Sequence, residues 1–195
     1  MGFRGAILDA ICRLVEELAS GSLSSILLVD PRANRLRHGA APSLPSTYNE
    51  AVDGEVVGPS AGSCGTAAYR AQSVIVSDIA TDPLWADYRD VALAHGLRAC
   101  WCTPILSSAR KVLGTFAIYR REPRSPTAED LNLVTQIVHI ASIAVERKLA
   151  EETLRRSEAY LAEAQRFSQT GSFAATPGLG EIRYWSEERF RVLGF

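Results

Sequence analysis

A stretch of about 40 residues without proline or glycine constrains this chain more than any other feature. It begins at Thr127 and continues to Thr170. Thr127 and Asp130 have the spacing of a capping box, in which two side chains satisfy the free N–H groups at a helix start. The stretch therefore predicts one helix of about 40 residues and roughly 60 Å, at 1.5 Å per residue. Such a helix is longer than the domain that precedes it.

Two apolar seams follow each other along this predicted helix. Each has the alternating steps of three and four residues that are typical of paired helices. The first consists of Val134, Val138, Ala141 and Val145, and the second of Ala150, Leu154, Ser157 and Leu161. We expect a parallel dimer through this helix, and the step of five residues between the seams suggests two competing registers that could act as a switch. A solvated helix with a few ion pairs is the open alternative.

The residues before this helix predict an antiparallel α+β domain with a sheet of five or six strands. Local turns and short helices join the strands, without the strand-helix-strand repeat of a parallel sheet. Helices are predicted at 3–20, 62–70 and 83–95, with Ser63 available as the cap of the second. Strands are predicted at 25–30, 35–41, 73–77, 98–106 and 112–119.

Composition excludes several classes of protein. Hydrophobic residues make up 47% and charged residues 22% of the 195 positions, an ordinary globular balance. The net charge of −1 gives no bulk attraction to nucleic acid or to an anionic membrane. Four cysteines without framework spacing favour a reducing compartment. No apolar run is long enough for a membrane span and no signal peptide is evident, so we expect a cytoplasmic location.

Four segments closely resemble the GAF domain family, in the family's order. They are Gly62-Ser-Cys-Gly-Thr-Ala-Ala-Tyr-Arg70, Val76-Ser-Asp-Ile-Ala-Thr-Asp-Pro83, Gly96-Leu-Arg-Ala-Cys-Trp-Cys-Thr-Pro-Ile105 and Val112-Leu-Gly-Thr-Phe116. The resemblance implies a GAF sensory domain at 1–148, followed by a helical connector at 149–168.

The C-terminal residues resemble the opening of a PAS domain that the chain does not complete. The resemblance rests on residues 164–173 and 180–195, with two short strands and a helix at 186–193, and assigns 169–195 to a truncated PAS domain. A GAF domain, a helix and a PAS domain in this order resemble bacterial sensor histidine kinases. This arrangement implies a non-enzymatic sensory module that forms a homodimer and controls a downstream kinase or other output domain.

The GAF resemblance also places a possible ligand pocket between the sheet and the helices of residues 46–95. The predicted lining is Cys64, Trp85, Tyr88, Cys100 and Trp101. An unidentified small molecule could bind there, and no cofactor is predicted. The sequence favours plain core packing of the same aromatic residues over a ligand pocket.

Enzymatic chemistry has one specific candidate, a thiol enzyme that reduces free methionine sulfoxide. Cys64 lies at a predicted helix start, where N–H groups would stabilise a thiolate, and Cys100 or Cys102 could pair with it. Related reductases carry a further cysteine where this chain has Trp85-Ala-Asp87, which argues against the activity. The histidines are scattered and form no zinc signature with the cysteines. The cysteines also lack the neighbouring histidine that is typical of covalent bilin attachment. His139 lacks the sequence context of a phosphoacceptor.

Overall fold

A sheet of five antiparallel strands forms the centre of the N-terminal unit. Along the sheet the order is β2-β1-β5-β4-β3. The computed structural model describes residues 3–168, 173–175 and 182–185, and the chain divides into two units, Met1–Arg147 and Lys148–Phe195. The strands are β1 (Ser22–Asp30), β2 (Arg35–Ala40), β3 (Val74–Val76), β4 (Ala99–Leu106) and β5 (Val112–Arg120). The predicted antiparallel α+β architecture is confirmed, with the lower of the two expected strand numbers.

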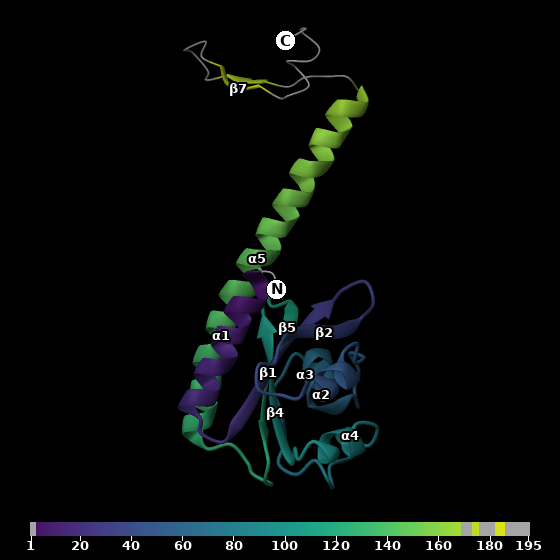
Figure 1. Ribbon diagram of the computed structural model, residues 1–195, viewed down its shortest axis with the longest axis vertical. Helices are drawn as coiled ribbons and strands as arrows, with labels where there is room; N and C mark the ends of the chain where they lie inside the picture. The colour runs from purple at the N-terminus through teal and green to yellow at the C-terminus, as the bar shows by residue number, and fades with distance from the viewer. Residues whose placement is uncertain (1–2, 169–172, 176–181, 186–195) are drawn as a thin grey trace. The chain divides into compact units, whose positions relative to one another are not determined.

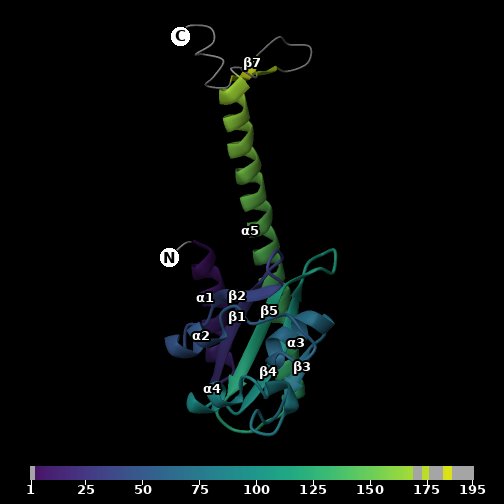
Figure 2. The ribbon, with the colours of Figure 1, turned by 90° about the vertical axis from the view of Figure 1, so that its right-hand side faces the viewer.

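Helices cover both faces of this sheet (Figure 1). One face carries α1 (Phe3–Leu18) and the first part of α5 (Ala128–Ser168), which lie behind the sheet in Figure 2 and share one core with it. The other face carries α2 (Ser46–Val52), α3 (Gly62–Arg70) and α4 (Arg89–Ala94). Side chains alternate between the two faces of a strand. Ala117 and Tyr119 of β5 therefore join the core under α2 to α4, whereas Phe116 and Ile118 join the core under α1 and α5.

The predicted helix at 83–95 is interrupted. A 3₁₀ turn, η1 (Pro83–Trp85), begins where the Asp82 carboxylate accepts the N–H of Leu84, and α4 begins only at Arg89. Between them Trp85 turns into the core, where its indole N–H donates to the Ser63 hydroxyl at 3.0 Å. A turn at residues 86–88 separates the two helical segments.

The Ser63 hydroxyl does not cap α3, which corrects the prediction from sequence. Ala61 occupies the capping position without a side-chain bond. The Ser63 hydroxyl instead donates to the Cys100 carbonyl at 3.3 Å and accepts from Trp85. It therefore links α3 to β4 and to η1.

The start of α5 has the capping box that its sequence predicts. The N–H of Asp130 donates to the Thr127 hydroxyl, and the Asp130 carboxylate accepts the N–H of Thr127 at 2.8 Å. The same carboxylate lies 3.3 Å from Arg124 and 3.7 Å from Arg120, which is buried against the Trp101 ring. The Asp130 carboxylate thus joins the start of α5 to the end of strand β5.

The first predicted dimer seam lies in the core of its own domain, which corrects the expectation. Val134, Ala141 and Val145 are buried, and Val138 is partly buried, against the sheet face formed by residues such as Phe116 and Ile118. These side chains follow the same three-and-four spacing because a sheet also presents a continuous apolar surface to a helix. The step of five residues therefore separates a core face from an exposed face, and it does not separate two competing dimer registers.

The C-terminal unit contains the remainder of α5 and an antiparallel pair of short strands, β6 (Phe173–Ala175) and β7 (Ile182–Trp185). Two short strands are predicted in this region. The predicted helix at 186–193 lies outside the described residues. Within the described part of the chain, no helix is both long and apolar enough to cross a bilayer.

Candidate functional site

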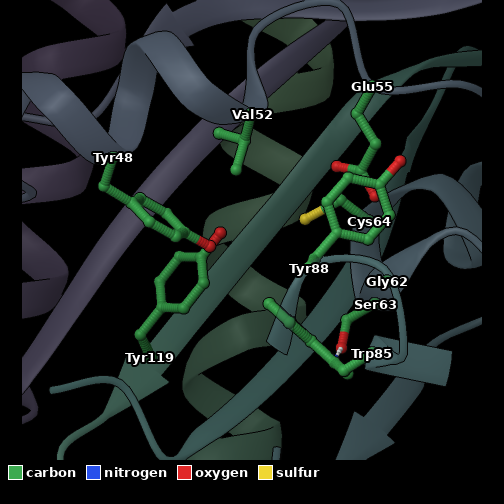
Figure 3. A pocket seen from close by; sticks show the side chains of 9 residues that line it. All are labelled: Tyr48, Val52, Glu55, Gly62, Ser63, Cys64, Trp85, Tyr88 and Tyr119. Atoms are coloured by element: carbon green, nitrogen blue, oxygen red, sulfur yellow. Dashed lines mark hydrogen bonds between the residues drawn. The ribbon is translucent and has the colours of Figure 1, made fainter. Parts of the chain in front are cut away.

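A narrow cavity lies between the sheet and the α2–α4 layer of the N-terminal unit (Figure 3). Its volume is about 10 Å³, roughly the room that one water molecule needs. Side chains from α2, α3, β5 and the η1 region point towards it. The residues that line it are Tyr48, Val52, Glu55, Gly62, Ser63, Cys64, Trp85, Tyr88 and Tyr119.

A second hollow, of about 440 Å³, is larger but open. It is lined by His38, Ser46, Asn49, Glu50 and Asp53. The narrow cavity is the stronger candidate, because it combines aromatic walls with a buried carboxyl group.

Two glycines of α3 allow the Glu55 carboxyl group to reach the first turn of that helix. Gly62 has φ +54°, and a Cβ there would lie 2.9 Å from Glu55 Oε1. A Cβ on Gly65 would lie 2.3 Å from the Val56 carbonyl oxygen. The N–H of Gly65 donates to Glu55 Oε1 at 3.3 Å. The Gly-Ser-Cys-Gly sequence is therefore required by close packing between α3 and the preceding loop.

Glu55 is a buried acid that has no basic partner among the described residues. Its exposed fraction is 9%, and none of the ion pairs between described residues includes it. Burial raises the pKa of Glu55 well above its usual range, and the N–H of Gly65 opposes this only in part. An acid in this setting is costly to ionise unless a positive charge comes close to it.

Aromatic side chains surround the cavity. The Tyr48 and Tyr119 rings meet edge to face with centroids 5.8 Å apart, and their hydroxyl groups point into the cavity (Figure 3). Burial raises the pKa of both phenols well above the usual value, so both stay protonated. Trp85 is buried below them, and half-buried Tyr88 lies beside Glu55.

Three cysteine thiols lie together at the cavity wall, where Cys64 lines the cavity and Cys100 and Cys102 contact Cys64. Cys64, Cys100 and Cys102 are all buried. Hydrogen bonds from the thiols of Cys100 and Cys102 lower the pKa of Cys64, whereas burial raises the pKa of the two donors. The structure therefore brings together the three sulfur atoms that the thiol-enzyme hypothesis needs, but it covers all of them with protein.

The structure brings together three of the five residues predicted to line a pocket. Cys64, Trp85 and Tyr88 line the cavity. Cys100 belongs to the same core and interacts with Cys64, but it does not line the cavity. Trp101 does not line the cavity, because alternation along β4 turns it to the opposite face of the sheet, where its indole N–H donates to the Arg124 carbonyl.

The sequence analysis missed Tyr48, Glu55 and Tyr119. Tyr119 could have been found, since it alternates in phase with Ala117 on a predicted strand. Glu55 has no such signal, because it lies in an irregular loop after α2. Among the described residues, no group of three or more histidine, cysteine or acidic side chains is arranged to hold a metal ion.

Comparison with known proteins agrees with the fold. Residues 4–146 match the family model for the GAF domain. A relative from Methanosarcina acetivorans, the methyl sulfide methyltransferase-associated sensor, is 40% identical over 158 residues, which cover 79% of this chain. The same region is 16% of that relative, so this chain spans less than a fifth of its length.

Solved structures with low sequence identity share the architecture. A domain provisionally described as part of a two-component sensor histidine kinase from Sinorhizobium meliloti has a TM-score of 0.65 at 19% identity, covering 80% of this chain and 99% of that one. Free methionine-R-sulfoxide reductase from Neisseria meningitidis has a TM-score of 0.59 at 19% identity, covering 73% and 77%. With the family match over most of its length, this chain belongs to the GAF domain family.

Proposed function

We propose that this chain is a sensory and dimerising input module, which relays the state of its cavity through α5 to an output domain such as a histidine kinase. The relative from Methanosarcina acetivorans is described as a sensor. The observation that carries the proposal is the exposed extension of α5. The side chains from Leu149 to Ala164 are all exposed. A PAS domain following this helix belongs to the same proposal.

Strand β5 gives a physical route from cavity to helix. Tyr119 lines the cavity on one face of this strand, while the adjacent Ile118 packs in the core that includes α5. Protein cores are closely packed, so a shift of one side chain displaces its neighbours. A change at Tyr119 would thus alter how the sheet supports Ala141 and Val145 of the helix.

The exposed face of α5 has the spacing of a dimer seam. Counted along the sequence, its a and d positions alternate by steps of three and four without interruption. The positions are Ile140, Ile143, Arg147, Ala150, Leu154, Ser157, Leu161 and Ala164. Ile140, Ile143, Leu154 and Leu161 are large apolar side chains left exposed. A helix that packs against nothing is marginally stable in water, and pairing with a second copy would bury these residues.

Light scattering on the purified chain tests the dimer. We expect a dimer at micromolar concentration, and conversion to monomer, with at least about a hundredfold weaker association, when Leu154→Glu and Leu161→Glu are combined, because charges would face each other in the seam. Ala159→Glu places the same charge on the opposite side of the helix and should leave the dimer intact. A monomeric wild-type chain, or a double variant that still dimerises, would disprove pairing through this seam.

A thiol reductase is the second candidate, and the Cys64, Cys100 and Cys102 cluster is the observation that favours it. The assay is NADPH-coupled reduction of free methionine sulfoxide, with a thioredoxin system as electron donor. We expect no turnover above that of the Cys64→Ser variant, because the protein covers all three sulfur atoms. Turnover that Cys64→Ser abolishes would establish the enzyme and reject the purely sensory module.

A further inference from the structure

We infer that the cavity is a site for a small organic ammonium ion, held by the Glu55 carboxylate, by the Tyr48 and Tyr119 hydroxyl oxygens that point into it and by the surrounding aromatic rings. This inference rests on the proposed sensory function and names the chemical class of its signal. It follows from the composition of the cavity wall.

The first argument is the charge of the site. Glu55 faces the cavity, and the described residues provide no basic side chain to pair with it. Its remaining stabilisation comes from one backbone N–H, that of Gly65 in the first turn of α3. A buried acid is normally paired or neutralised. A cationic ligand would supply the missing charge.

The second argument is the identity of the walls. Four aromatic side chains contribute to a cavity of only nine lining residues: Tyr48, Trp85, Tyr88 and Tyr119. Aromatic faces attract cations through the ring quadrupole, and the attraction grows when water is excluded. Aliphatic side chains would serve equally well for a purely apolar ligand, but here Val52 is the single aliphatic side chain on the wall. Anionic ligands are disfavoured, because they would meet the acidic Glu55 side chain.

The third argument is size. The cavity has room for about one water-sized group, which suits the ammonium end of methylammonium. A larger head group needs one wall to move. Tyr88 is suited to this movement, because it is half-buried at the start of α4 and its hydroxyl group makes no hydrogen bond among the described residues. Trp85, by contrast, is anchored through its bond to Ser63.

Isothermal titration calorimetry on the 195-residue chain tests the inference with pairs of probes. Methylammonium chloride is compared with sodium chloride. Choline is compared with 3,3-dimethylbutan-1-ol, which has the same shape without the charge. We expect binding of methylammonium or choline and at least about tenfold weaker binding of the neutral alcohol. Binding of choline and of the alcohol with equal measurable affinity, or no binding of either ammonium ion beyond the sodium chloride control, would overturn the inference.

Matched variants test the roles of individual residues. Glu55→Gln keeps an oxygen acceptor for the Gly65 N–H and removes the charge, so it should fold and bind at least about thirtyfold more weakly. Glu50→Gln removes an exposed acid of α2 outside this cavity and should bind as the wild type does. Tyr88→Leu should weaken binding about tenfold through loss of a ring face. Undiminished affinity in Glu55→Gln would refute the assigned ligand class.

The two proposals fail separately. A chain that dimerises through α5 but binds no ammonium ion keeps the sensory module and loses this ligand class. A monomeric chain that binds choline through Glu55 keeps the site and loses the proposed helix pairing.

Discussion

Gly65→Ala should lower the free energy of unfolding by about 3 kcal/mol or more. A Cβ at this position would lie 2.3 Å from the Val56 carbonyl oxygen and 2.7 Å from the Ala61 Cβ. Both obstacles are backbone or close to backbone, so no side-chain rotation relieves the overlap. The first turn of α3 must move away from the loop that carries Glu55, and the cavity wall moves with it.

Urea unfolding followed by circular dichroism measures the change in free energy. In thermal unfolding, the melting temperature should fall by roughly 6–12 °C, at 2–4 °C per kcal/mol for a chain of this size. Gly58→Ala is the matched control, because a Cβ there meets only the Ala61 Cβ at an ordinary 3.9 Å. We expect this control to change stability by less than about 0.5 kcal/mol. A Gly65→Ala variant as stable as the control would show that the close approach of loop and helix is absent in solution.

Asp130→Ala should cost about 3 kcal/mol, because this carboxylate serves two structures at once. It completes the capping box of α5 with Thr127, and it is the acidic partner of Arg120. The side chains of Arg120 and Asp130 are only 6% and 11% exposed. Removing the acid would leave the Arg120 charge buried, with the Ser20 carbonyl and the Trp101 ring as its remaining contacts.

Glu129→Ala is the control for this variant. Glu129 is an exposed acid in the same helical turn, and its loss should cost no more than about 1 kcal/mol through the helix dipole. Urea unfolding of both variants at pH 7 provides the comparison. Equal costs for the two variants would contradict the role of Asp130 in holding Arg120.

The difference between wild type and Asp130→Ala should depend on pH in a defined direction. Burial raises the pKa of Asp130, but the Thr127 hydrogen bonds and the Arg124 and Arg120 charges outweigh it and hold the pKa below the usual 3.8. The folded state therefore binds this proton less readily than the unfolded state does. The stability difference should be constant from pH 7 down to about pH 5 and should shrink as the pH falls further.

Local sequence signals predicted the elements of this fold with good accuracy. Thr127 and Asp130 marked the start of α5, and the absence of proline and glycine marked its length. The turn residues separated β1 from β2 and β4 from β5 at nearly the observed boundaries. These signals succeed because caps, turns and strand alternation depend on residues close together in the chain.

Long-range contacts decided what each apolar side chain packs against. The spacing of Val134, Ala141 and Val145 fits a partner helix and a sheet equally well, and only the tertiary structure shows that they cover the sheet of their own domain. Trp85 likewise packs in the core and donates to Ser63, a residue 22 positions away along the chain, and no local pattern predicts this bond. Periodicity reports that a face is apolar and does not report what covers it.

The family and the Cys64 neighbourhood were determined by the sequence alone, since the GAF-like motifs stand in order along the chain and match residues 4–146. The cavity chemistry was decided by the tertiary structure. Glu55 carries no periodic or motif signal, and it becomes a buried, unpaired acid only because Gly62 and Gly65 let α3 approach its loop. Burial is a property of the folded chain. The sequence alone therefore could not show that this glutamate would be enclosed in the protein.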